Sequence, residues 1–208
     1  MDINTQSLVH SVEELEELIG QPSPLAKNKV ISYLDSHVID FLLKSPFVIL
    51  STSDSNGFCD ASPRGDAAGF IKVIDAHTFI IPERPGNKRL DSIRNILHNP
   101  KIGLLFLIPG LNETLRINGS AFITKDQNLL EQMNVAEKTP KLGIIVKVDE
   151  CFIHCAKAFI RSNLWDSTSW KSELPNAAKI LVTHAKSLQT NVKKVQEQLE
   201  ESYTKRLY

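Results

Sequence analysis

Two adjacent cations, Lys88 and Arg89, lie in a glycine- and proline-rich loop directly before a predicted helix that begins with Asp91 and Ser92. The first backbone N–H groups of a helix have no partner within the helix, and together with the helix dipole they attract anions. Neighbouring cations add charge-assisted hydrogen bonds. The pattern therefore favours a site for a dianionic phosphate over an ordinary solvated loop.

A second polar loop, Ala61–Asp66, follows a predicted strand and reads ASPRGD. Pro63 cannot donate to a β-ladder, so we expect the strand to break or bulge at Pro63, Arg64 and Gly65. A bulged edge strand is one interpretation of this break. Two such loops in one small β-rich region favour the other interpretation, which is a site for a phosphorylated cofactor.

The composition is that of an ordinary globular protein, and it excludes several functional classes. The 208 residues are 42% hydrophobic, and 24 Lys and Arg balance 24 Asp and Glu. A neutral chain has no overall field that attracts nucleic acid or an anionic membrane. Its apolar runs are too short for a membrane helix, and its acidic N-terminus is unlike a signal peptide. Three cysteines cannot all pair within one chain, which favours a reducing compartment, and we expect a cytoplasmic protein.

Helices are predicted at both ends of the chain. Ser11 and Glu14 form a capping-box pattern, and Gly20 would end that helix. Ser23-Pro24 opens a second helix, whose apolar positions recur at three- and four-residue steps until Pro46. After a polar linker from Asp166, a single long helix is predicted over Asn176–Tyr208.

Short β-runs separated by turns fill the middle of the chain. No long helix separates successive strands, apart from predicted helices at Ser92–His98 and Asp126–Met133. This order predicts a mainly β fold, an antiparallel barrel of six or seven strands with flanking helices. We expect N-terminal helices packing on the barrel (1–45), the barrel (46–165), and a linker with a C-terminal helix (166–208), as one domain. The predicted strands are Phe47–Ser53, Phe58–Ser62, Gly69–Ile74, Thr78–Pro82, Lys101–Ile108, Leu115–Thr124 and Leu142–Cys155.

Three motifs carry a resemblance to a known family. They are SPRG from Ser62, then PGNKRxDSxxNIxxNPxxGLLFxIPGxxETLRxNGxA from Pro85, then CFIHCAKAxxRSxLW from Cys151. Over about Phe41–Trp165 the chain resembles the pyridoxamine 5'-phosphate oxidase-like flavoproteins, within a branch of unassigned substrate. The resemblance implies an FMN-binding split barrel and a homodimer with FMN at the subunit interface. True pyridoxamine-phosphate oxidases carry an Arg and a His in a C-terminal substrate motif, which this chain lacks, and this argues against vitamin B6 oxidation.

The resemblance also implies which residues hold FMN. The strand with Ser62, Pro63, Arg64 and Gly65 would run beside the flavin, and Ile81 and Pro82 would end a flavin-adjacent strand. Asn87, Lys88 and Arg89, with Ser92, would form the phosphate site, and the Thr114 side chain would reach the ring. Lys157, Arg161 and Trp165 would come from the second subunit. Lys157, Arg161 and Trp165 are spaced four apart, so on a helix they would share one face.

The sequence therefore predicts an FMN-dependent oxidoreductase that acts on a small molecule, with no side chain assigned as catalytic acid or base. The alternatives are a non-catalytic flavin- or haem-binding module, for which His154 and His37 would matter, and an F420-dependent reductase on the same fold. We predict no metal site, because alternation along a strand separates His154 from Cys151 and Cys155.

Overall fold

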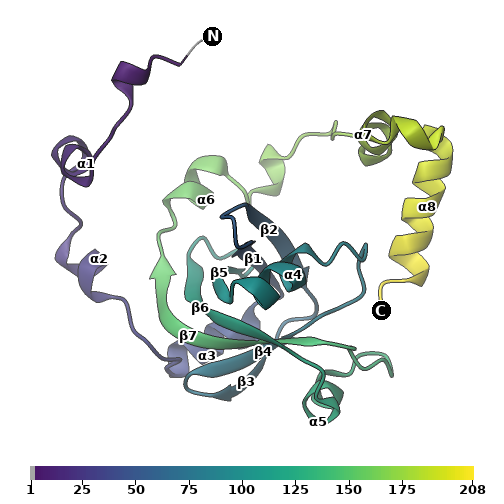
Figure 1. Cartoon of the computed structure of the whole chain (residues 1–208), viewed down its shortest axis with the longest axis horizontal. Helices are drawn as coiled ribbons and strands as arrows, with labels where there is room; N and C mark the ends of the chain where they lie inside the picture. The colour runs from purple at the N-terminus through teal and green to yellow at the C-terminus, as the bar shows by residue number, and fades with distance from the viewer. Residues whose placement is uncertain (1–2) are drawn as a thin grey trace. The chain divides into compact units, whose positions relative to one another are not determined.

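The computed structural model describes residues 3–208, which form two units divided after Val30 (Figure 1). The first unit contains the 3-10 turn η1 (Thr5–Ser7) and helices α1 (Val12–Ile19) and α2 (Pro24–Asn28). The Ser11 hydroxyl accepts from the Glu14 N–H, and Gly20 ends α1, as the capping pattern predicts. The expected packing of these helices on the barrel stays a prediction.

The second unit is built around one sheet of seven strands, in the order β2-β1-β5-β6-β7-β4-β3 (Figure 1). All neighbouring pairs are antiparallel. This architecture, with its flanking helices, confirms the predicted split-barrel fold. The strands are β1 (Phe47–Ser53), β2 (Cys59–Gly65), β3 (Lys72–Asp75), β4 (Thr78–Pro82), β5 (Lys101–Leu107), β6 (Thr114–Thr124) and β7 (Gly143–His154).

The core lies on the inner face of this curved sheet. Along β1, Val48 and Leu50 are fully buried while Ser51 is exposed, the alternation expected of a strand with one covered face. Phe79 of β4 meets Phe106 of β5 edge to face, with ring centroids 6.1 Å apart. Removing this apolar surface from water stabilises the sheet.

Helix α3 (Ser36–Lys44) contributes Val38, Phe41 and Leu42 to the same core. A single helix from Ser23 to Pro46 is therefore a wrong prediction, because the chain leaves the helical conformation between α2 and α3. Ile31 exchanges backbone hydrogen bonds with Cys151 of β7 at 3.1 and 2.7 Å. These bonds occupy backbone groups that a continuous helix would need for itself.

Helix α4 (Asp91–His98) follows β4 and packs Ile93 and Ile96 into the core. Asp126 caps α5 (Gln127–Leu130), which continues as η2 (Glu131–Met133), as predicted. After β7 come α6 (Lys157–Ser162) and η3 (Ser167–Ser169). In residues 3–208, no helix is both long and apolar enough to cross a membrane.

The C-terminal segment is not one helix, so that prediction is wrong. It contains α7 (Ala177–His184), η4 (Lys186–Leu188) and α8 (Val192–Lys205). Gln189 has a left-handed backbone with φ of 45°, and the Asn191 side chain then caps α8 by accepting from the Lys194 N–H. Asn191 is a strong N-cap residue, so α8 begins there.

Candidate cofactor-binding site

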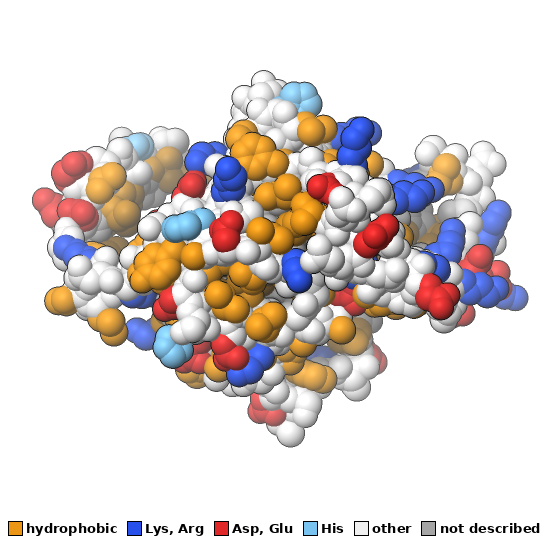
Figure 2. Space-filling view, turned by 90° about the horizontal axis from the view of Figure 1, so that it is seen from below, with side chains coloured by type: hydrophobic (Ala, Val, Ile, Leu, Met, Phe, Trp, Pro, Cys, Tyr) orange, Lys and Arg blue, Asp and Glu red, His pale blue; other side chains and the backbone are white. Residues whose placement is uncertain are grey.

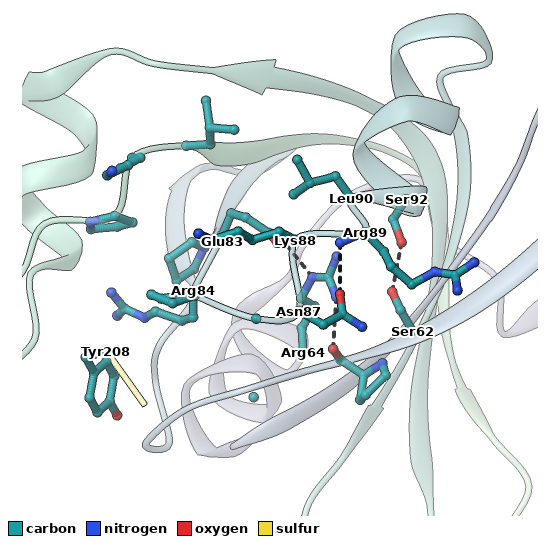
Figure 3. A pocket seen from close by; sticks show the side chains of 18 of the residues that line it. Ser62, Arg64, Glu83, Arg84, Asn87, Lys88, Arg89, Leu90, Ser92 and Tyr208 are labelled. Atoms are coloured by element: carbon teal, nitrogen blue, oxygen red, sulfur yellow. Dashed lines mark hydrogen bonds and ion pairs between the residues drawn. The ribbon is translucent and has the colours of Figure 1, made fainter. Parts of the chain in front are cut away.

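A cavity of about 910 Å³ opens beside the edge strand β2. It is lined by β2, the loop after β4, the first residues of α4, the segment 138–142 and Tyr208 (Figure 3). Small-molecule sites span roughly 300–1,000 Å³, so this volume suits a cofactor together with a small substrate.

Strand β2 alternates half-buried polar side chains with exposed residues. Asp60, Ser62 and Arg64 are half-buried, whereas the residues between them are exposed. The Ser62 and Ser92 hydroxyls lie 2.8 Å apart, which joins β2 to the start of α4 (Figure 3). Deeper in the structure, the Asn95 amide donates to Asp60 Oδ2 at 2.8 Å. These bonds fix the distance between the strand and the helix that form the site.

The loop before α4 has an unusual backbone. Lys88 and Leu90 adopt left-handed conformations with φ of 63° and 59°, which are rare for residues with side chains. Leu90 occupies the N-cap position and gives no side-chain cap, so the first N–H groups of α4 have no capping acceptor. Asn87 Oδ1 accepts from the Arg89 N–H at 3.0 Å and holds the loop (Figure 3). Strained backbone and free N–H groups together suit an anion site.

Arg64 and Glu83 form a partly buried ion pair, with Arg64 Nε 3.1 Å from Glu83 Oε2. The orientation is not that of a hydrogen bond, so both of these buried atoms have no hydrogen-bond partner. Burial raises the pKa of the Glu83 carboxyl, and the attraction of Arg64 only partly opposes this. These two charges face each other in the cavity wall, so the pair joins β2 to the loop after β4.

At the other end of the cavity, Arg84 Nε donates to Asp66 Oδ2 at 2.7 Å. The Tyr208 hydroxyl donates to Asp66 Oδ1 at 2.7 Å, and the Arg84 guanidinium lies 5.7 Å from the centre of the Tyr208 ring. Although burial opposes it, hydrogen bonds from Tyr208 and Arg84 lower the pKa of Asp66, and the same bond to Asp66 raises the pKa of Tyr208. Lys138 Nζ donates to the Tyr208 carbonyl oxygen at 2.8 Å. Tyr208 is thereby attached to the cavity rim.

A sequence model described as pyridoxamine 5'-phosphate oxidase matches residues 34–155, which include most of the barrel and much of this site. The chain belongs to the pyridoxamine 5'-phosphate oxidase family. No curated protein matches the chain.

Solved structures similar to this family member share its fold at low sequence identity. HupZ from Group A Streptococcus is 20% identical, with a TM-score of 0.45, covering 57% of this chain and 92% of its own. A protein of Clostridium acetobutylicum related to general stress protein 26, of the pyridoxinephosphate oxidase family, is 14% identical, with a TM-score of 0.42 and coverages of 58% and 89%. HutZ, the heme storage protein of Vibrio cholerae, is 12% identical, with a TM-score of 0.41 and coverages of 58% and 94%.

Most of the site residues expected of a pyridoxamine 5'-phosphate oxidase family member line the cavity. Those that do are Ser62, Pro63, Arg64, Gly65, Pro82, Asn87, Lys88, Arg89 and Ser92. Ile81 is fully buried in the core, and Thr114 is buried at the start of β6, so neither lines it. The predicted break at Pro63 is absent, because β2 pairs regularly with β1 through Gly65. Pro63 is tolerated because β2 is the edge strand.

Lys157, Arg161 and Trp165 do not line the cavity of their own chain. Lys157 and Arg161 lie on α6 as expected, but the helix ends at Ser162, so Trp165 does not continue its face. Trp165 instead stacks on Phe159 and donates its indole N–H to the Leu111 carbonyl at 2.8 Å.

Sequence reasoning missed several lining residues of this family member. Glu83 and Arg84 belong to the loop it singled out, and their charges were a usable signal. The lining residues Lys138, Lys141 and Tyr208 lie far from that loop in the sequence and gave no local signal.

The histidine and cysteine residues lie away from the cavity. His154 is exposed at the end of β7 and stacks on Phe152, and His37 lies on α3. Cys151 is buried, its thiol donates to the Tyr33 carbonyl, and burial raises its pKa to about 11. No group of three or more metal-ligating side chains occurs among residues 3–208.

Proposed function

We propose that this chain binds FMN in the cavity beside β2 and acts as an FMN-dependent oxidoreductase on a small organic molecule. The observation that carries the proposal is the uncapped start of α4, preceded by Lys88 and Arg89 in a strained loop, which opens into the same cavity as Arg64. Proteins of this family generally bind flavins, which adds support.

The residues present fit such a cofactor. Lys88, Arg89 and the free N–H groups of α4 would hold the phosphate, and the hydroxyl of Ser92 lies beside them. Strand β2 offers its unpaired edge, since it pairs only with β1.

FMN would supply the transfer of electrons or a hydride, and the chain would position it and adjust the charge around it. Arg64 is the cation suited to oppose negative charge on the reduced flavin, with Lys157 of a second subunit as the other candidate. In this structure Glu83 already offsets part of the charge of Arg64. Because burial favours the neutral form of Glu83, protonation of this carboxyl would release the full charge of Arg64. No group is assigned as the catalytic acid or base.

We further propose a homodimer in which Lys157, Arg161 and Trp165 complete the partner's cofactor site. Family members commonly form dimers. Apolar side chains gather in the middle of one face of the molecule (Figure 2). The exposed apolar residues of the second unit include Phe122 of β6, Ile153 of β7 and Ile160 of α6. Surfaces of this kind are typical of interfaces.

The absorption spectrum of the purified protein tests the proposal. We expect a yellow protein that releases FMN on heating, with about one flavin per chain. Turnover of reduced nicotinamide with an electron acceptor would support an enzyme over a non-catalytic flavin module. A protein that takes up F420 or haem in place of FMN would contradict the proposal, as would a chain that binds none of the three.

A further inference from the structure

Tyr208 forms part of the cavity wall, although it belongs to the C-terminal segment that follows the barrel. Its hydroxyl donates to Asp66 Oδ1 at 2.7 Å, and its carbonyl oxygen accepts from Lys138 Nζ at 2.8 Å. Its ring lies 5.7 Å from the Arg84 guanidinium, at the end of the cavity away from Ser62 (Figure 3). These three contacts attach the end of the C-terminal segment to the cavity.

The opposite side of the cavity wall is fixed to the barrel. Hydrogen bonds between Ser62 and Ser92 and between Asp60 and Asn95 join β2 to α4. Helix α4 also buries Ile96 in the barrel core. These two elements therefore cannot move away from the cavity without disturbing the core.

The C-terminal segment is attached in a different way. The buried side chains of its helices are Ala178 of α7 and Val195 of α8, and neither belongs to the apolar cluster of the barrel. Residues 166–176, which connect the barrel to α7, are all exposed. Segments with few buried apolar contacts separate from a fold at low cost in free energy. The C-terminal segment can therefore leave the barrel without opening the core.

We propose that the segment 177–208 is a detachable strap, which closes the Arg84 end of the cavity through Tyr208 and opens it when a ligand enters or leaves. In the closed state Tyr208 contacts Arg84 and Asp66, whose side chains are only 14% and 2% exposed. In the open state water replaces the contacts of Tyr208, while the ion pair between Arg84 and Asp66 remains. The strap goes beyond the proposed function, because its opening requires no particular cofactor.

Detachment should destabilise the helices of the strap, and this makes opening measurable without a ligand. Helix α7 has 8 residues and α8 has 14. Isolated helices shorter than about 12–15 residues are marginal in water. The backbone amides of α8 should therefore exchange with solvent mainly from the detached state, so their exchange rate reports how often the strap opens.

The first test compares hydrogen exchange in the full-length wild type and in Tyr208→Phe by mass spectrometry. This variant loses the donor to Asp66 and keeps the ring. Loss of one hydrogen bond to a charged group should raise the exchange rate of the α8 amides about tenfold and leave β5 and β6 unchanged. The control is Tyr203→Phe, the same change at an exposed tyrosine of α8, which should exchange like the wild type. Equal exchange of α8 in Tyr208→Phe and the wild type would overturn the proposal, as would equally faster exchange in β5 and β6.

The second test measures FMN binding kinetics by stopped-flow fluorescence, and its choice of probe rests on the proposed function. If FMN enters and leaves through the open state, Tyr208→Phe should raise the association and dissociation rates by the same factor, up to about tenfold, and leave the affinity unchanged. A rise in the dissociation rate alone would show that Tyr208 holds FMN directly, and it would overturn the strap's control of entry, as would unchanged rates. A protein that binds no FMN would refute the proposed function, and hydrogen exchange would then decide whether the strap detaches.

Discussion

Removing the cation of Arg89 is the most direct perturbation of the proposed phosphate site. Its side chain is 76% exposed and pairs with Asp91 at 3.1 Å, so the pair contributes at most about 1 kcal/mol to stability and the Arg89→Ala variant should fold. A charge-assisted hydrogen bond contributes about 1.5–3 kcal/mol. Because water screens so exposed a group, we expect the lower limit, which corresponds to about tenfold weaker FMN binding at 1.4 kcal/mol per decade.

Fluorescence titration of FMN measures this change, since flavin emission responds to binding. The matched control is Lys101→Ala, which removes a cation from a similarly exposed ion pair, with Asp149, outside the cavity. A variant of opposite sign strengthens the design. Asp91→Asn removes a carboxylate from the place proposed for a dianion and should tighten FMN binding severalfold.

Adding Lys88→Gln to Arg89→Ala should weaken binding further, to about a hundredfold if the two cations act independently. High salt should reduce the difference between these variants and the wild type, because screening weakens exposed charge interactions. An FMN affinity of the double variant within about twofold of the wild type would refute a phosphate site at Lys88 and Arg89. The loss of even one phosphate contact should weaken FMN binding at least about tenfold.

Two further predictions concern the carboxyl on the cavity wall and the second subunit. The pKa of Glu83 is raised above 4.5 in the folded state, so the folded state binds this proton more tightly, and stability is lost as pH rises through the folded pKa. The thermal unfolding midpoint of Glu83→Gln should therefore rise relative to that of the wild type as the pH rises. A difference between the two midpoints that stays constant from about pH 4 to about pH 8 would contradict this. Trp165→Ala changes no residue that lines the cavity of its own chain. If light scattering shows a dimer and this variant binds FMN more weakly than the wild type, the shared site is supported. A monomer with full FMN affinity would refute it.

The strands were predictable because their signals are local. β1 and β4 match the expected ranges Phe47–Ser53 and Thr78–Pro82, where apolar and β-branched runs are bounded by turn residues. The two wrong helix predictions have different causes. Ile31 pairs with Cys151 of β7, a contact across more than a hundred residues that periodicity cannot show. In the C-terminal segment, the capping residue Asn191 was a readable signal that the apolar stripe obscured.

The two ends of the cavity differ in how they are encoded. The end proposed for the phosphate is one contiguous segment, Gly86–Ser92, so its cations, its helix start and its glycine could all be recognised together. The Arg84 end depends on Asp66, Lys138 and Tyr208, which come from three distant parts of the chain. The fold brings these three residues together, so no local sequence pattern could predict that they lie close to one another.

The two ends of the cavity also differ in how closely they are tied to the barrel and its core. The segment around Lys88 is tied to the barrel through Ser62 and Asn95, so a change there disturbs the sheet as well as the cofactor. The Tyr208 segment is attached to the cavity rim by polar contacts with Asp66 and Lys138, with its ring against Arg84. Its sequence can therefore change without repacking the core, since those contacts lie outside the buried apolar cluster.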